Sequence, residues 1–204
     1  MILIGQYDSP FVRRVGIAMR LYGLEFEHRP WSTFGDAEQI RPFNPLMRVP
    51  VLVLDSGEAL VESHGIVDYI DRLAPADRVL FPLDQPARYQ ALRIAALATG
   101  FAEKSVSLFY EQRLHSDVSD LWVKRCVSQI SGTLAVLEAD RAARHSEYWF
   151  GDRIGHADIA VATAFRHMKD AHPGLFGQHE FPALAAHSKR LEALPVFQEI
   201  QQVF

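Results

Sequence analysis

The chain contains a single cysteine, Cys126, among its 204 residues. One cysteine excludes an intrachain disulfide framework and favours a reducing compartment. Cys126 lies in a stretch with helical periodicity, so we interpret it as a buried, unreactive thiol. The first residues lack a basic segment followed by a long apolar run, which excludes a secretory signal peptide there. We therefore expect a cytoplasmic protein.

Long apolar runs and basic clusters are also lacking. No run approaches the roughly 20 apolar residues that cross a membrane. The net charge is -4 and the basic residues are scattered, so we expect neither a membrane nor a nucleic acid as partner. Of the nine histidines, His167 and His172 stand five residues apart, off one helical face, and no His-Glu-x-x-His run occurs. We expect no metal site.

The N-terminal part of the chain alternates two kinds of apolar pattern. Short apolar or alternating segments predict strands at residues 1–5, 24–31, 49–54 and 59–61. Segments with an apolar face and capping residues predict helices over 9–23, 35–41 and 62–73. The resulting order is βαβαββα, and its parallel βαβ start requires a right-handed crossover. We assign residues 1–76 to this α/β domain.

The pattern changes beyond residue 76. Pro75, Pro82 and Pro86 punctuate a mixed polar stretch, so residues 77–85 are predicted to be a linker. Residues 86–204 read as an all-helical domain. Its expected helices run over 87–114 and 116–145, begin near 156, and end with 182–194 and 196–204. The predicted fold is therefore α/β plus all-α, with no internal repeat.

Ser9 is the first candidate for chemistry, because it stands between the first strand and the first helix. A helix N-terminus concentrates partial positive charge, and a hydroxyl there can donate a hydrogen bond to an anion. N-capping alone also explains a serine at this place. Spacing leaves both interpretations open.

Two further candidates lie beside the later strands. One comes just before the third strand and the other just after the fourth. A cis bond between Val49 and Pro50, although the rarer isomer, would turn the Val49 main chain outward to pair with an extended peptide. Glu62-Ser63 is either a plain helix cap or a site for an amino-acid head group, with Ser63 on the carboxylate and Glu62 on the ammonium. In a βαβαββα fold, these candidates and Ser9 lie along one rim of the sheet.

Four segments carry a resemblance to a known family. Ser9–Val15 is similar to a Ser-Pro-aromatic-x-Arg-Lys-Val motif, and Asn44–Leu52 to an Asn-Pro-x-x-x-Val-Pro-x-Leu run. Leu60–Ile70 is similar to a Glu-Ser-x-Ala-Ile-x-x-Tyr-Leu segment, and Gly151–Ala160 to a Gly-x-x-x-Ser/Thr-x-Ala-Asp motif. In this order, they resemble the glutathione transferase superfamily, in particular its serine-type bacterial members. The resemblance implies a thioredoxin-like first domain and a C-terminal helical bundle.

The resemblance also implies roles for the candidate residues. Ser9 would donate a hydrogen bond to the sulfur of glutathione. Val49 would pair through its main chain with the cysteinyl unit, beside cis-Pro50, and Glu62 and Ser63 would hold the γ-glutamyl head. Glutathione would serve as a co-substrate, without a metal.

The remaining expectations concern the two ends of the ligand. Arg48 would approach the glycyl carboxylate. Phe11, Phe101, Ser105 and Leu108 are predicted to line a pocket for a small apolar electrophile. Core packing or a subunit interface is the alternative for the residues of the later helix. The implied activity is conjugation, for detoxification, in a homodimer.

Two departures from the family pattern keep other functions open. Gly155 stands where the family has Ser or Thr as a helix cap, so Asp158 is expected to lack its reciprocal partner. Thr99 stands where many members have an aspartate that reaches the γ-glutamyl ammonium of the partner subunit. The alternatives are another glutathione-dependent activity, such as a peroxidase, dehalogenase or isomerase, or a non-catalytic interaction protein.

Overall fold

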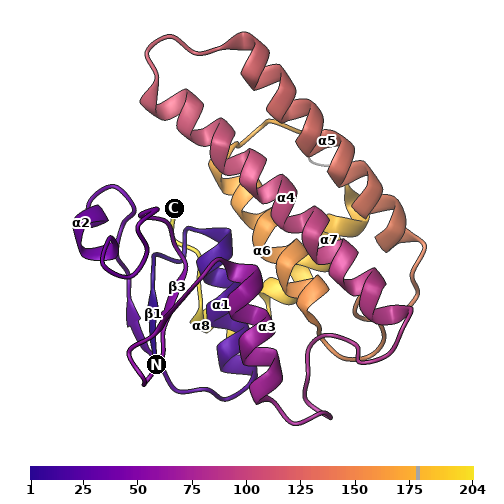
Figure 1. The fold of residues 1–204 in the computed structure, drawn as a ribbon. Coiled ribbons are helices and arrows are strands. Elements are labelled where there is room, and N and C mark those ends of the chain that lie inside the picture. Colours follow the sequence, from indigo (N-terminus) through magenta and orange to yellow (C-terminus); the bar gives the residue numbers. More distant parts are fainter. Residues whose placement is uncertain (178–179) are drawn as a thin grey trace. The chain divides into compact units, whose positions relative to one another are not determined.

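Residues 1–177 and 180–204 are described by a computed structural model, and they form two compact units (Figure 1). The first unit contains residues 1–80 and 194–203, and the second contains residues 81–193 with Phe204. The predicted domains, 1–76 and 86–204, differ from these units chiefly at the C-terminus.

The N-terminal unit has the predicted βαβαββα order. Its elements are β1 (Ile2–Ile4), α1 (Pro10–Leu21), β2 (Glu27–Arg29), α2 (Ala37–Ile40), β3 (Val51–Val53), β4 (Ala59–Val61) and α3 (Ser63–Leu73). The sheet order is β2-β1-β3-β4, with β1 parallel to β2 and the other two pairs antiparallel. This arrangement confirms the predicted thioredoxin-like fold, although each strand is shorter than expected.

Local sequence explains where α1 and α3 begin. Pro10 takes the first helical position of α1, where its missing N–H removes no helical bond, and Ser9 is the cap. Apolar residues on α1 and α3 are buried, and the two helices pack against each other. Ile4 and Val51 on the sheet belong to one buried apolar cluster with Ile40 of α2.

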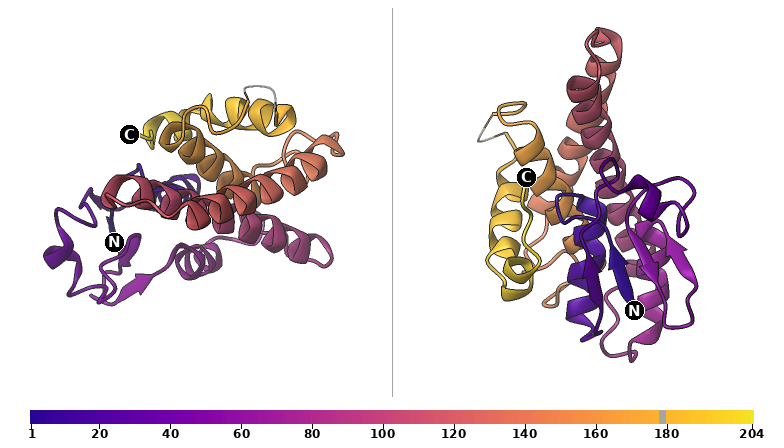
Figure 2. Two further views of the ribbon diagram at one scale, coloured as in Figure 1. Left: turned by 90° about the horizontal axis from the view of Figure 1, so that it is seen from above. Right: turned by 90° about the vertical axis from the view of Figure 1, so that its left-hand side faces the viewer.

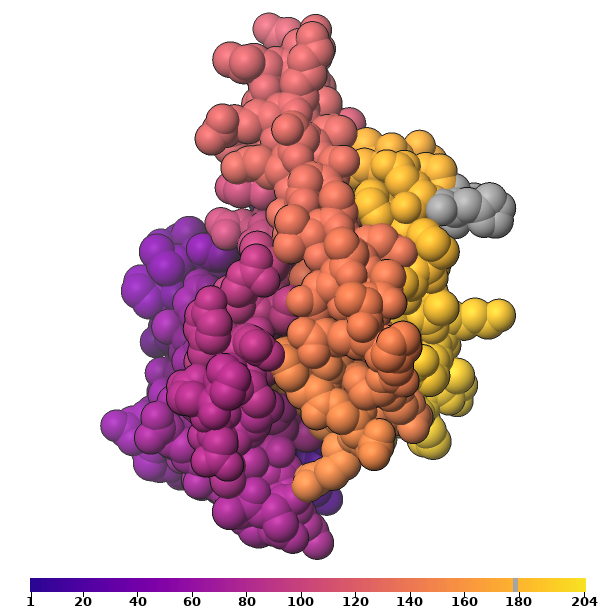
Figure 3. Space-filling view, turned by 90° about the vertical axis from the view of Figure 1, so that its right-hand side faces the viewer, coloured from indigo at the N-terminus to yellow at the C-terminus, as the bar shows by residue number. Residues whose placement is uncertain are grey.

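The helical unit is built on two long neighbouring helices. They are α4 (Ala87–Leu114) and α5 (Asp120–Ala142), joined by a short connection at the end of the unit that stands uppermost in Figure 3. The bounds of α4 match the prediction, whereas α5 begins later than predicted because Ser119 caps it. α6 (His156–Ala171) packs against α4, and α7 (Pro182–Glu192) packs against α5 and α6 (Figure 2).

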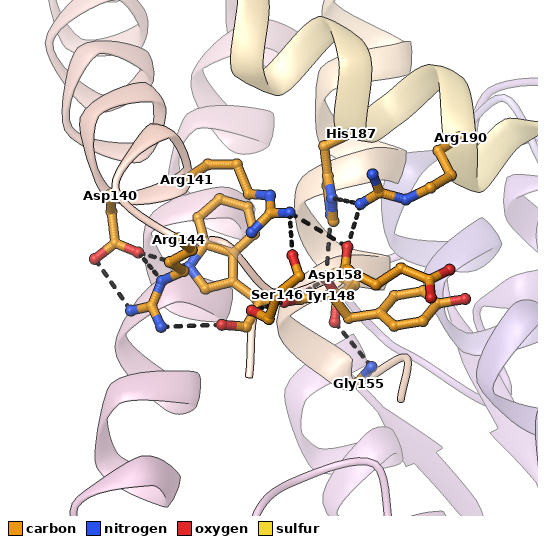
Figure 4. Close-up of polar contacts among 11 residues, drawn as sticks. Asp140, Arg141, Arg144, Ser146, Tyr148, Gly155, Asp158, His187 and Arg190 are labelled. Atoms are coloured by element: carbon orange, nitrogen blue, oxygen red, sulfur yellow. Dashed lines mark hydrogen bonds and ion pairs between the residues drawn. The ribbon is translucent and has the colours of Figure 1, made fainter. Parts of the chain in front are cut away.

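A buried polar network joins α5, α6 and α7 (Figure 4). One oxygen of Asp158 accepts the Gly155 N–H at 2.9 Å, and the other accepts the Trp149 N–H at 2.8 Å. His187 Nε2 lies 3.2 Å from the same carboxylate. Gly155 offers no side chain in return, so α6 keeps one half of the reciprocal cap, as expected. Both oxygens of the Asp158 carboxylate therefore accept a main-chain N–H.

The chain returns to the N-terminal unit at its end. α8 (Pro195–Glu199) packs against α1 and is shorter than the predicted helix over 196–204. The cause is Arg13, whose fully buried guanidinium donates to Ile200 O at 2.8 Å and Phe197 O at 3.1 Å. These bonds satisfy carbonyls at the end of α8, where no further helical turn follows. Residues 194–203 thus belong to the same compact unit as residues 1–80.

Three smaller findings concern the cysteine, membrane-spanning helices and metal ligands. Cys126 is fully buried on α5, as predicted, and burial raises the pKa of its thiol. No helix in the described part of the chain is long and apolar enough to cross a membrane. Across residues 1–177 and 180–204, no group of three or more His, Cys, Asp or Glu side chains is placed to hold a metal ion.

We expect Arg13→Met to lower the free energy of unfolding by about 3 kcal/mol, because two buried carbonyls lose a charged donor. Urea denaturation measures this change. Arg72→Met is the control, since the Arg72 side chain is 76% exposed and pairs with Asp68 on its own helix. That change should cost about 0.5 kcal/mol or less. Equal stability of the two variants would contradict the role given to Arg13.

Candidate functional site

The strand register gathers the candidate residues at one edge of the sheet. Ile4 pairs with Val51, and Val51 pairs with Val61, so the three form one row across the sheet. Ile4 is the last residue of β1, Val51 the first of β3 and Val61 the last of β4. The loop to Ser9, the segment before Val51 and the start of α3 therefore leave the sheet on the same side, as predicted.

Ser9 is the N-cap of α1. Its backbone is extended, and its Oγ accepts the Val12 N–H at a long distance of 3.4 Å. The side chain is half-buried. A hydroxyl that accepts this N–H still has its own proton to donate, and Ser9 stands at the positive end of a 12-residue helix. This arrangement suits an anion.

Tyr7 is the other hydroxyl in the loop before α1, and its ring faces elsewhere. The ring stacks on His28 with the centroids 4.0 Å apart, and its hydroxyl lies against the middle of α1 at Gly16. Burial raises the pKa of Tyr7 to about 12, with Glu199 adding to the rise and Arg20 opposing it. Burial also raises the pKa of Asp8. Among these neighbours, Ser9 is the one that caps the helix.

The Val49–Pro50 peptide bond is cis. Among the described residues, the main-chain N–H and C=O of Val49 make no hydrogen bond, so both can pair with an extended ligand. Gly5 allows Val49 to lie close to α1. A Cβ on Gly5 would stand 2.5 Å from a methyl of Val12 and 2.8 Å from the Cβ of Val49, and its φ of +127° also requires glycine.

Glu62 precedes α3 in a strained conformation. Its φ is +64° and its ψ is 127°, which costs about 1–3 kcal/mol for a residue with a side chain. The carboxylate makes no capping bond to the helix and is about half exposed. Arg48 Nη1 lies 3.7 Å from Glu62 Oε1, which links the loop before Pro50 to the start of α3. Such strain is typical of functional sites, where it fixes a side chain toward a ligand.

Ser63 is the first residue of α3 and is buried. Its Oγ accepts a hydrogen bond from Arg14 Nη1 at 3.4 Å. This bond links α1, which carries Ser9, to α3. The contact of Gly5 with both Val12 and Val49 provides a second link, so the structure brings Ser9, Val49 and Ser63 to one end of the N-terminal unit.

Three of the four residues predicted for the second-substrate pocket are buried in the helical unit. Phe101, Ser105 and Leu108 are fully buried on the face of α4 that packs inside the helical unit. Core packing is the role that the structure gives to these three side chains, because spacings of four and three residues place them on the same helical face. Phe11, on the first turn of α1, is half-buried and stays a candidate.

Comparisons with known proteins identify the family. Residues 3–78 match the glutathione S-transferase N-terminal domain, and residues 120–190 match its C-terminal domain. The GST-like protein YibF of Escherichia coli is 34% identical over 169 residues, which is 82% of each chain. The chain belongs to the glutathione S-transferase family. Both of its units carry that family's sequence pattern, as the resemblance implied.

Solved glutathione S-transferases share the whole fold. One from Methylobacterium radiotolerans, in complex with glutathione sulfonate, has a TM-score of 0.90 and 31% identity, covering 100% of this chain and 97% of that one. A family member from Pseudomonas fluorescens Pf-5, with bound glutathione, has a TM-score of 0.85 and 28% identity, with 100% and 99% covered. Both of these relatives bind glutathione or a derivative of it.

Thr99, which stands where many glutathione S-transferases have an aspartate, is hydrogen-bonded within its own helix. Thr99 is buried, and its hydroxyl donates to Ala95 O at 3.0 Å and to Ala96 O at 3.2 Å. These are carbonyls of its own helix, so the side chain is used within α4. It carries no charge for a ligand's ammonium group.

Two residues of the site were missed by the sequence analysis. Gly5 was read as the end of a strand, and its φ and close contacts depend on a neighbour 44 positions away, Val49. Arg14 was read as part of a motif, without a role of its own. The signal for Arg14 was weak: adjacent Arg13 and Arg14 interrupt the apolar first half of the helix, which suggests that at least one of them is buried.

We expect Gly5→Ala to weaken glutathione binding and to destabilise the protein by about 2–4 kcal/mol, because the new Cβ meets Val12 and Val49. Calorimetry and chemical denaturation measure the two effects. Gly57→Ala is the matched control, since Gly57 also has positive φ but no atom within 4 Å of an added Cβ. Gly57→Ala should lower the free energy of unfolding by about 1 kcal/mol and leave the affinity for glutathione unchanged. Unchanged affinity in Gly5→Ala would contradict the close packing at Val49.

Proposed function

We propose that this protein is a glutathione transferase that joins the glutathione thiolate to a small apolar electrophile. The observation that carries the proposal is the position of Ser9. Its hydroxyl caps α1 at the sheet edge where the Val49 main chain and the start of α3 also lie. An anion donor, a main-chain pairing site and a head-group site therefore stand together.

Each part of glutathione has a partner of suitable chemistry at this edge. The cysteinyl unit pairs with the Val49 main chain, as one more short strand beside Pro50. The γ-glutamyl carboxylate takes the Ser63 hydroxyl and the first N–H groups of α3, and its ammonium takes Glu62. Arg48 supplies a positive charge for the glycyl carboxylate.

Ser9 acts by stabilising the thiolate. A free thiol has a pKa near 8.5, so a few per cent is ionised at pH 7. Lowering this pKa by about two units requires roughly 2.7 kcal/mol in favour of the anion. A hydroxyl donor and a helix N-terminus together supply energy of that order. Ser9 does not remove the proton, which leaves to solvent.

The reaction then follows from the nucleophile. The thiolate sulfur attacks an electrophilic carbon and forms a carbon–sulfur bond. With a chloronitroaromatic substrate, the carbon–chlorine bond breaks and chloride leaves with the bonding electrons. Proton and chloride are released, so atoms and charge balance. Phe11, on the first turn of α1, is the residue that we retain for contact with the apolar substrate.

Thr99 favours a second candidate, a glutathione-binding protein without transferase activity. Without an aspartate at this position, Glu62 alone carries negative charge for the ligand's ammonium among the proposed contacts. Weaker glutathione binding would suit an interaction protein. A chain that binds glutathione with millimolar or tighter affinity, yet fails with chloronitroaromatics, hydroperoxides and haloalkanes, would establish this candidate instead.

We expect Ser9→Ala to lower the rate of conjugation to a chloronitroaromatic about 5-fold at pH 6.5. Its pH–rate midpoint should move up by about one unit, because the bound thiol loses a donor to its anionic form. Since the thiolate reacts, activity falls as pH drops through this midpoint, and the variant loses activity at higher pH than the wild type does.

Ser119→Ala is the matched control for this experiment. Ser119 caps α5 as Ser9 caps α1, and it accepts the Trp122 N–H at 3.3 Å. Both changes should cost about 1 kcal/mol of stability. Only Ser9→Ala should change the pH profile, and equal rates in Ser9→Ala and the wild type would remove Ser9 from the mechanism.

We also propose that the protein is a homodimer in the cytoplasm, in which the N-terminal unit of one subunit faces the helical unit of the other. Exposed apolar side chains on α4, among them Tyr89 and Leu92, are suited to such an interface. Sedimentation at micromolar concentration should give a species of twice 23.1 kDa. A single species of 23.1 kDa under those conditions would contradict the dimer.

A further inference from the structure

Arg14 is a buried charge whose donors are largely unused. Its side chain on α1 is 1% exposed. Nη1 donates to Ser63 Oγ at 3.4 Å, while Nε and Nη2 have no hydrogen-bond partner among the described residues. Burying a guanidinium without partners costs several kcal/mol. Its neighbour in the chain, Arg13, is equally buried, but donates to two carbonyls of the C-terminal segment.

The charge of Arg14 is not balanced by an acidic side chain. Within the described residues, no carboxylate forms an ion pair with it. The residue that it contacts, Ser63, opens α3, and the nearby charged group on that turn is Glu62, which pairs with Arg48 instead. Burial lowers the pKa of Arg14 to about 10, so the group stays charged at neutral pH. The α1–α3 junction thus holds a positive charge with spare donors.

We propose that Arg14 is the positioning residue that makes this site select thiol peptides with a free α-carboxylate on the head group. The inference rests on the proposed function and assigns to Arg14 a role in head-group choice. The guanidinium N–H occupies a lone pair of Ser63 Oγ. The Ser63 proton is then directed away from Arg14 and is donated to the ligand's carboxylate.

Charge supports the same choice. The carboxylate would approach the first N–H groups of α3, with the uncompensated guanidinium behind Ser63. In a site of low dielectric, such a charge favours an anionic head group over a neutral one of similar shape. Hydrogen bonds that involve a charged group contribute more than neutral ones. We therefore expect the site to bind the anionic head group about 10-fold to 100-fold more tightly than the neutral one.

The experiment compares three ligands by calorimetry on the full-length protein. They are glutathione, γ-aminobutyryl-cysteinyl-glycine, which lacks the α-carboxylate, and glutaryl-cysteinyl-glycine, which lacks the α-amino group. The wild type should bind glutathione at least 10-fold more tightly than the first analogue. Arg14→Met should reduce this ratio to about 3-fold or less, and should leave the ratio for the second analogue within about 3-fold of the wild-type value.

Two variants control for charge and for folding. Arg14→Lys keeps the positive charge, so its carboxylate ratio should stay within about 3-fold of the wild-type ratio. Arg20→Met removes an arginine from the same helix that pairs with Glu199 at 2.8 Å, and it should leave the ratio unchanged. Arg14→Met should raise the KM for glutathione by a larger factor than it lowers kcat, because the effect lies in recognition of the head group.

The outcomes separate this inference from the proposed function. If the wild type does not bind glutathione, the proposed function fails. If it binds glutathione and the decarboxylated analogue equally well, or if folded Arg14→Met keeps the carboxylate ratio, the inference alone is overturned. If Arg14→Lys binds glutathione and the decarboxylated analogue equally well, the positive charge is not what selects the carboxylate. If Arg14→Met does not fold, a carboxylate ratio near one in the wild type or in Arg14→Lys still overturns the inference.

Discussion

The pairing of Ile4 with Val51, and of Val51 with Val61, is the constraint on which the site depends. A shift of one residue in this register would turn the buried faces of the strands outward, so the apolar core fixes the pairing. The same pairing sets where β1, β3 and β4 reach the edge of the sheet. Two helix N-termini and one unpaired main-chain segment are placed there by strands of only three residues each.

Contacts between the elements maintain this arrangement. Gly5 lets Val12 and Val49 approach each other, and Arg14 donates to Ser63. The C-terminal segment holds α1 from its other side through Arg13. Residues 9–14 therefore hold the cap proposed for the ligand, an arginine used for folding and an arginine proposed for head-group choice. Residues that are adjacent in the chain have different functions because they face different sides of one helix.

Local sequence was sufficient for the element order and for the caps. The apolar period and Pro86 fixed α4, and Ser9-Pro10 fixed the start of α1, because caps and proline act within a few residues. It was insufficient where distant segments meet. The return of residues 194–203 depends on Arg13, which lies at the other end of the chain. The burial of Phe101 depends on how α4 packs against its neighbours. The sequence pattern could therefore not distinguish a side chain that lines a pocket from one in the core.

The account's central claim is that the start of α1, with the Ser9 hydroxyl, stabilises a sulfur anion. An ultraviolet titration of glutathione bound to the wild-type protein, which follows thiolate absorbance against pH, tests this claim most directly. The account predicts an apparent thiol pKa of about 6.5, roughly two units below that of a free thiol. A bound thiol that titrates at the same pH as free glutathione would contradict it.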